Sequence, residues 1–134
     1  AAKAGVELKM VIRGIFCFLT ENKKFKHPAQ AISIVDEYLE HSRIMIFYNG
    51  GKEKKFMASA DWMVCNIDKR VEVACTILEK NIQQENKDII QIQLKDNIKA
   101  RILDNDLSNQ YVNPRNTKKI RSQVETYNYL YRKG

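Results

Sequence analysis

Short apolar runs separated by turn residues predict several strands in the first half of the chain. The run at residues 44–48 is apolar throughout, which is typical of a strand buried on both faces. Asn49, Gly50 and Gly51 follow it, and residues of this type tolerate positive φ, so a hairpin into residues 55–58 is expected. Further strands are predicted at residues 6–12, 15–19, 31–39 and 71–77, the last with a half-buried alternation.

The second half of the chain has helical periodicity. Residues 81–94 place isoleucines at helical spacing, and residues 117–132 place Ile120, Val124, Tyr127 and Tyr131 on one face. Residues 97–103 could form another strand, and the polar stretch 104–116 predicts a loop. Strands early and helices late indicate a mixed α/β sandwich.

The N-terminal pattern suggests that an element is missing. Residues 1–4 resemble the last turn of a helix, and Gly5 is placed to form its left-handed cap before the first strand. Since the chain also lacks an initiator Met, we expect the C-terminal piece of a longer protein, truncated at its N-terminal edge. The alternative is an expression-tag remnant followed by a complete small domain.

Composition and charge narrow the class of partner. A chain of 134 residues with 44% hydrophobic and 29% charged residues fits one ordinary globular domain. Lys and Arg number 23 against 16 Asp and Glu, a net charge of +7, which favours polyanions such as nucleic acid, polyphosphate, nucleotides or anionic lipid. A soluble domain that is merely basic is the alternative. The scattered Cys17, Cys65 and Cys75 favour a reducing compartment.

Two residues at strand ends are candidates for phosphate chemistry. His41 directly precedes the apolar strand at residues 44–48, and a histidine side chain can exchange a proton near neutral pH. Arg13 ends the first predicted strand beside Gly14, and the planar donor fork of guanidinium matches phosphate. The alternatives are purely structural roles: a His41 that hydrogen-bonds to nearby backbone and an Arg13 that pairs with a surface carboxylate.

The remaining candidates are weaker. Asp61 could orient a histidine or an arginine, while the neighbouring Trp62 is the kind of residue found more often in a core. Arg70 is a further candidate cation, with an ion pair to Asp68 or Glu72 as its alternative. The sequence contains no GxxxxGK[ST] loop, GxGxxG motif or CxxC pair, so no phosphate loop or metal site is predicted from motifs.

Several segments together resemble the polyphosphate kinase family, the large type related to phospholipase D. Residues 8–17 contain Arg13-Gly14 and resemble its "VRGICCL" segment, and residues 38–44 resemble "FLEHSRI". Further matches, in the order and spacing of the family, are residues 49–51 ("NGG"), 59–63 ("SADWM"), 66–73 ("NLDRRVEV"), 96–101 ("DNVKAR") and 107–112 ("LSNRYV"). Each is weak alone, but their order over nearly the whole chain is highly specific.

The resemblance implies a fold and an activity. It implies an α/β fold, phospholipase-D-like, with a mixed β-sheet flanked by helices, and it makes residues 1–134 the C-terminal domain of a larger chain. The family reversibly transfers the terminal phosphate of ATP to inorganic polyphosphate. The implied partners are ATP, ADP, polyphosphate, the upstream domains of the same chain and further copies in a homo-oligomer, but no specific nucleic acid. A cytoplasmic protein that can sit at the inner membrane face is implied.

The resemblance also assigns residues. Arg13, His41 and Arg70 fall on the family's phosphate-binding positions, and His41 is the catalytic candidate within this chain. The histidine that becomes phosphorylated and the residues linked to Mg²⁺ lie upstream, so the metal ligands are expected outside these residues. We therefore expect the isolated chain to be inactive, although the phosphate contacts of its ATP substrate would be formed here.

The match to the phospholipase D pattern is partial, which leaves alternatives open. His41-x-Arg43 keeps the histidine of H-x-K but replaces the lysine, and Ser59-x-Asp61 stands where S-x-N would be. Arg43, Ser59 and Asp61 are thus expected to support phosphate binding. The alternatives are a phospholipase-D-like phosphodiesterase or nuclease using His41, and a non-catalytic basic module that binds nucleic acid.

Overall fold

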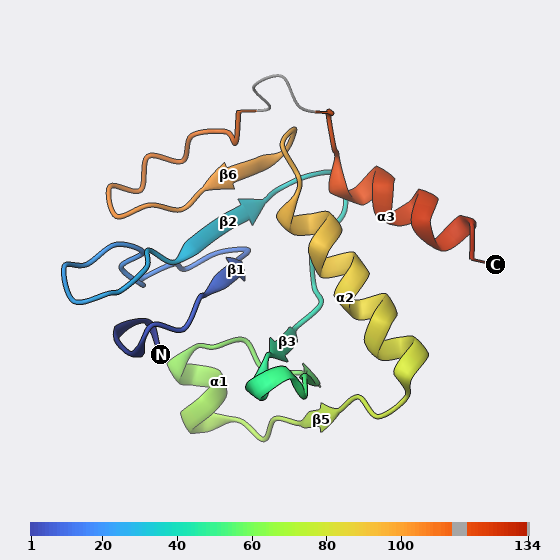
Figure 1. Ribbon diagram of the computed structural model, residues 1–134, viewed down its shortest axis with the longest axis horizontal. Coiled ribbons are helices and arrows are strands. Elements are labelled where there is room, and N and C mark those ends of the chain that lie inside the picture. The colour runs from blue at the N-terminus through green and yellow to red at the C-terminus, as the bar shows by residue number, and fades with distance from the viewer. Residues whose placement is uncertain (114–117, 134) are drawn as a thin grey trace. The chain divides into compact units, whose positions relative to one another are not determined.

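The computed structural model describes residues 1–113 and 118–133. The chain divides into two compact units: unit 1 comprises Ala1–Glu40 and Ile90–Gly134, and unit 2 comprises His41–Ile89. Each unit contains its own three-stranded sheet (Figure 1). The predicted α/β class is confirmed, with strands and helices divided between the two units.

The sheet of unit 1 is mixed. Strands β1 (Lys9–Val11) and β2 (Gln30–Ile34) run parallel, and β6 (Ala100–Ile102) pairs antiparallel with β2. The buried residues of this sheet are Ala31, Ser33, Ile34 and Ala100, and Ala100 is completely buried. Helix α3 (Ser122–Tyr131) and the short 3₁₀ helix η1 (Ala2–Ala4) belong to the same unit.

The sheet of unit 2 is an antiparallel meander in the order β3 (Ile44–Phe47), β4 (Lys54–Ala58), β5 (Ala74–Thr76). The predicted hairpin is confirmed. A 3₁₀ turn, η2 (Asn49–Gly51), joins β3 to β4, and all three of its residues have positive φ. Helix α1 (Val64–Lys69), which the sequence patterns did not predict, separates β4 from β5. Helix α2 (Lys80–Leu94) begins in unit 2 and ends in unit 1, and it confirms the helix expected at residues 81–94.

The apolar run 15–19 is not a strand, contrary to the prediction. Ile15 adopts a positive φ of 53° and is 76% exposed. The aromatic residues that follow contact one another instead: Phe18 stacks on Phe25 with ring centroids 6.0 Å apart, and Phe16 lies 6.4 Å from Phe18. The apolar character of this run therefore comes from a local aromatic cluster, which periodicity alone cannot distinguish from a strand.

Burial was overestimated at two strands of unit 2. The run at residues 44–48 forms β3, but its residues are only half-buried and Phe47 is 50% exposed. The strand predicted over residues 71–77 shortens to β5, which is exposed because it lies at the sheet edge. Val71 before it is 99% exposed. In both places the residue pattern correctly predicted a strand, but it predicted more burial than the strand has.

The remaining elements are shorter than predicted. The strand of residues 6–12 reduces to β1, that of 31–39 to β2, and that of 97–103 to β6. The helix of residues 117–132 begins at Ser122, and its first predicted residue, Thr117, lies outside the described residues, as does the 114–116 end of the predicted loop. On α3, Tyr127 and Tyr131 stack on each other and are exposed rather than buried.

The left-handed cap predicted at Gly5 is confirmed, with φ 88° after η1, a 3₁₀ rather than an α-helical turn. A Cβ added at Gly5 would lie 2.8 Å from Cδ of Lys26, a flexible side chain that can move, so the main cost of Gly5→Ala is backbone strain. We expect Gly5→Ala to lower the free energy of unfolding by about 1–2 kcal/mol. Urea unfolding measures this. Gly14→Ala is the matched control, because a Cβ there meets nothing within 4 Å and the φ is not positive; an equal loss in both variants would contradict the strain argument.

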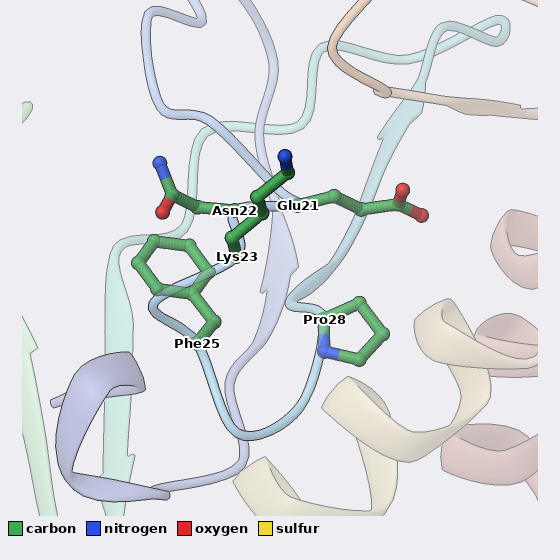
Figure 2. A pocket seen from close by; sticks show the side chains of 5 residues that line it. All are labelled: Glu21, Asn22, Lys23, Phe25 and Pro28. Carbon is green, nitrogen blue, oxygen red and sulfur yellow. The ribbon is translucent and has the colours of Figure 1, made fainter.

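A basic loop of unit 1 surrounds a surface hollow of about 490 Å³ (Figure 2). Its base is fixed by Asn105, whose Oδ1 accepts the backbone N–H of Thr20 at 2.8 Å and whose Nδ2 donates to the carbonyl of Glu21 at 2.8 Å. The hollow is lined by Glu21, Asn22, Lys23, Phe25 and Pro28. None of the predicted site residues lines it, so the hollow does not coincide with the predicted phosphate site.

Candidate functional site

Arg13 lies in unit 1, just beyond the carboxyl end of β1. The backbone N–H of Ile12 still bonds to the carbonyl of Ile32 at 2.8 Å, so the parallel pairing of β1 and β2 extends to the residue before Arg13. Nη1 of Arg13 donates to the backbone carbonyl of Glu40 at 3.2 Å, and the side chain is exposed. The carboxyl ends of parallel strands in α/β proteins are where ligands usually bind. Arg13 therefore presents a guanidinium at a suitable edge of its sheet.

His41, Arg43 and Asp61 come together in unit 2. Nε of Arg43 donates to Oδ1 of Asp61 at 2.8 Å and Nη2 donates to Oδ2 at 3.1 Å, a two-pronged ion pair. This pair forms because the antiparallel hairpin places the start of β3 beside the end of β4, and the N–H of Ala58 bonds to the carbonyl of Arg43 at 2.9 Å. The predicted supporting roles of Arg43 and Asp61 thus have a definite geometry.

The guanidinium of Arg43 lies against the imidazole of His41. Nη1 is 3.3 Å from Nδ1 and Nη2 is 3.3 Å from Nε2. The lone-pair and N–H directions of the two ring nitrogens diverge, so one guanidinium cannot donate in the ring plane to both. The two distances place the imidazole of His41 against the end of the guanidinium that carries Nη1 and Nη2. Arg43 also donates from Nη1 to the carbonyl of His41 at 3.3 Å.

The electrostatics of this trio hold Arg43 in its charged form. The hydrogen bonding of Arg43 to the Asp61 carboxylate, aided by the negative charge of that carboxylate, raises the pKa of the Arg43 guanidinium above its ordinary value. His41 is exposed, and Arg43 has 20% of its side chain exposed. An exposed imidazole backed by a fixed cation can meet an anionic ligand.

Ser59 and Arg70 are placed differently from the trio. The hydroxyl of Ser59 donates to Oε2 of Glu72 and accepts the N–H of Val73 at 3.0 Å, so it fixes the chain between α1 and β5. Arg70 is exposed just after α1, and among the described residues no ion pair joins it to Asp68 or Glu72, the alternative that the sequence left open. Arg70 presents an exposed charge within unit 2.

Trp62 differs from its expected place in a core, because 79% of it is exposed beside Asp61. The larger omission of the sequence patterns is Glu40. Its side chain accepts amide hydrogens from Gln93 and Gln123, both at 2.9 Å. The motif at residues 38–44 contains Glu40, but glutamines on amphipathic helices give no local signal of a distant partner, so sequence reasoning did not identify Gln93 or Gln123.

Three further findings concern the described residues. Over residues 1–113 and 118–133, no group of three or more His, Cys, Asp or Glu side chains is arranged to hold a metal ion. No helix in the same part of the chain is long and apolar enough to cross a membrane. Cys17, Cys65 and Cys75 are exposed free thiols.

Comparisons with known proteins identify the family of this chain. Residues 1–123 match the family described as polyphosphate kinase C-terminal domain 2. The polyphosphate kinase of Klebsiella pneumoniae is 44% identical over 130 residues, which is 97% of this chain and 19% of that protein. The polyphosphate kinase of Escherichia coli K12 is 43% identical over the same length.

Solved structures give the same result. The crystal structure of polyphosphate kinase from Porphyromonas gingivalis matches with a TM-score of 0.93 and 44% identity, covering 98% of this chain and 20% of that one. The chain thus spans about a fifth of the length of the relatives that it matches. On the match to residues 1–123 and the identity over nearly the whole chain, the protein belongs to the polyphosphate kinase family, in which it corresponds to C-terminal domain 2.

Proposed function

We propose that this chain binds the phosphates of ATP and of inorganic polyphosphate as part of a reversible phosphotransferase. The observation that carries the proposal is the arrangement of His41 on Arg43, with Arg43 fixed by Asp61 in two hydrogen bonds. Arg13 and Arg70 supply further cations, and the family relatives are named polyphosphate kinases. The fold in which these residues act is proposed to be phospholipase-D-like.

Phosphoryl transfer requires positioned positive charge more than covalent chemistry from the protein. In the proposed reaction the bond between the γ-phosphorus of ATP and its bridging oxygen breaks, and ADP leaves with that electron pair. The phosphoryl group passes through a histidine outside these residues to a terminal oxygen of polyphosphate. In unit 2, His41 and Arg70 are proposed to contact non-bridging oxygens and to stabilise their charge during transfer. Arg13 of unit 1 is proposed to contact phosphate oxygens in the same way.

Charge distribution supports a polyanionic ligand. Most of the excess positive charge lies in unit 1, whereas acidic and basic residues nearly balance in unit 2. We propose that Mg²⁺ assists the reaction. The described residues do not fit it, because they hold no cluster suited to a metal ion, so its ligands are proposed to lie elsewhere in a longer polypeptide. We further propose that the longer protein forms a homo-oligomer in the cytoplasm and lies peripheral to the inner membrane face.

Titration of the chain with ATP and with long-chain polyphosphate, at near-physiological salt, tests the proposal. We expect Arg13→Ala and His41→Ala each to weaken binding of both ligands by about threefold to tenfold. Arg132→Ala and His27→Ala are the matched controls, since each removes the same residue type at an exposed position. Both controls are expected to change binding by less than about twofold.

Single-stranded DNA distinguishes a site from general attraction to charge. Equal binding of all three polyanions, insensitive to Arg13→Ala and His41→Ala and abolished by salt, would contradict the proposal and support a nucleic-acid module. Cleavage of a model phosphodiester that His41→Ala abolishes would instead support a nuclease. Since the phosphorylated histidine is proposed to lie elsewhere, the isolated chain is expected to make no polyphosphate from ATP.

A further inference from the structure

The side chain of Glu40 is held from two helices of unit 1. Nε2 of Gln93, near the end of α2, donates to Oε2 of Glu40 at 2.9 Å. Nε2 of Gln123, in the first turn of α3, donates to Oε1 at 2.9 Å. Glu40 is half-buried and Gln93 is only 6% exposed. Both carboxylate oxygens therefore have a fixed amide partner.

The amide of Gln123 cannot turn over. Its Oε1 accepts the backbone N–H of Tyr38 at 3.1 Å, and its Nε2 donates to the carbonyl of Tyr38 at 2.8 Å. These two bonds fix which end of the amide faces Glu40, and that end is a donor. Position 40 must therefore present an acceptor, which a carboxylate does with either oxygen.

The preceding residues are fixed as well. Arg121 donates to both oxygens of Asp36, at 2.8 and 2.7 Å, and the side chain of Asp36 is only 1% exposed. The arginine hydrogen bond outweighs burial and lowers the pKa of Asp36 below its ordinary value, so the pair stays charged. The segment from Asp36 to Glu40 is thus held at both ends. Arg121, the residue before α3, binds Asp36, and Gln123 in the first turn of α3 binds Glu40.

The backbone of Glu40 is the partner of Arg13, since its carbonyl accepts Nη1 of Arg13 at 3.2 Å. Strands β1 and β2 are parallel, so the residues that follow them emerge at the same edge of the sheet. From these contacts we propose that Glu40 is a positioning residue for Arg13: by fixing the carbonyl at residue 40, its carboxylate orients the Arg13 guanidinium toward the phosphates of a bound nucleotide.

The inference rests on the proposed phosphate-binding role of Arg13 and explains how that role is achieved. An arginine on a free surface loses side-chain freedom when it binds a ligand, and part of the binding free energy is spent on that loss. A guanidinium that the protein already holds before binding, as the carbonyl of Glu40 holds Arg13, loses less. Glu40 would thereby contribute to affinity without contacting the nucleotide.

A double-mutant cycle on ATP affinity tests the inference. Glu40→Ala is expected to weaken ATP binding by about threefold to fivefold in the natural chain and by less than about 1.5-fold in the Arg13→Ala background. Gln93→Glu, which places a second carboxylate against Glu40, is expected to act like Glu40→Ala. Glu40→Gln is expected to retain most of the affinity, because the amide of Gln93 can turn to accept from it.

Glu7→Ala is the matched control, because Glu7 is an exposed carboxylate of unit 1 that pairs with Lys9. It removes the same charge and is expected to leave ATP affinity unchanged. A merely structural role of Glu40 would weaken binding equally with and without Arg13, and that result would overturn the inference. If Glu40→Ala does not fold, Gln93→Ala takes its place in the cycle with the same expected pattern.

The ¹⁵N–¹H signal of the Arg13 side chain separates this inference from the function on which it rests. Glu40→Ala is expected to shift and narrow the Arg13 Nε–H signal toward that of a mobile arginine. An unchanged signal would overturn the positioning role. If the signal changes but Arg13→Ala leaves ATP binding unaffected, the proposed phosphate contact of Arg13 fails, and with it the purpose assigned to Glu40.

Discussion

Asp96→Ala is expected to lower the free energy of unfolding by about 3–5 kcal/mol. Asp96 is 1% exposed, and its Oδ1 accepts three backbone N–H groups, from Ile98 at 2.9 Å, Lys99 at 2.7 Å and Ala100 at 3.0 Å. Its Oδ2 accepts the N–H of Ser122 at 2.7 Å. Alanine would leave buried donors without a partner and detach β6 from the start of α3.

Chemical denaturation of the Asp96 variants measures this loss. Asp96→Asn keeps the shape and one acceptor oxygen, so a smaller loss of about 1–3 kcal/mol is expected. Asp106→Ala, at an exposed loop position of the same unit, is the control and is expected to stay within about 0.5 kcal/mol of the natural chain. Equal losses at positions 96 and 106 would show that the bonds of Asp96 are not the source of stability.

Lowering the pH is expected to remove the stability that the ionised Asp96 carboxylate contributes. Burial favours the neutral form of Asp96, but hydrogen bonds from Ser122, Lys99 and Ile98 outweigh it and hold the pKa of the carboxyl below its ordinary value. A carboxyl with a lowered pKa in the folded state contributes stability above its unfolded pKa, about 3.9, and loses it as the pH falls through the folded value. Asp96→Asn is therefore expected to flatten the stability profile below about pH 4. A profile as steep as that of the natural chain would contradict this assignment.

Asp61→Ala is expected to weaken ATP binding by about tenfold or more, since it releases Arg43 and with it the His41 ring that Arg43 contacts. The direction of the change in ATP affinity makes this result diagnostic. Removing a carboxylate makes the chain more positive, so attraction by net charge alone would strengthen binding of an anion. Weaker binding can come only from the loss of geometry around Arg43 or from a loss of folded protein, and the latter is visible in the unfolding curve.

The matched control for Asp61→Ala is Asp68→Ala, an exposed carboxylate on α1 in the same unit. It changes the net charge equally and is expected to leave ATP affinity unchanged or slightly higher. Arg43→Lys keeps the charge but loses the two-pronged bond to Asp61, so it should weaken binding nearly as much as Asp61→Ala. Isothermal titration of the four proteins gives the comparison, and tighter binding by Asp61→Ala would show that Arg43 needs no anchor.

Local signals in the sequence predicted part of the fold well. Asn49, Gly50 and Gly51 predicted the turn because few other residues adopt positive φ cheaply, and all three do so. The helix at residues 80–94 followed from spacing that one amphipathic face requires. The strand predicted at residues 15–19 was wrong because an apolar run does not specify what its side chains pack against. The ring of Phe18 packs on Phe25 instead of on a neighbouring strand.

The sequence by itself identified the family and predicted candidate site residues, because motifs at fixed spacing specify chemical groups at strand ends. Of those residues, the structure brings His41, Arg43 and Asp61 together. Tertiary structure alone decided what holds them. The bonds of Gln93 and Gln123 to Glu40 join residues 53 and 83 positions apart, and Arg121 reaches Asp36 across 85 positions. A polar side chain on a helix looks the same in sequence whether it faces water or a distant carboxylate, since only folding brings donor and acceptor within hydrogen-bonding distance.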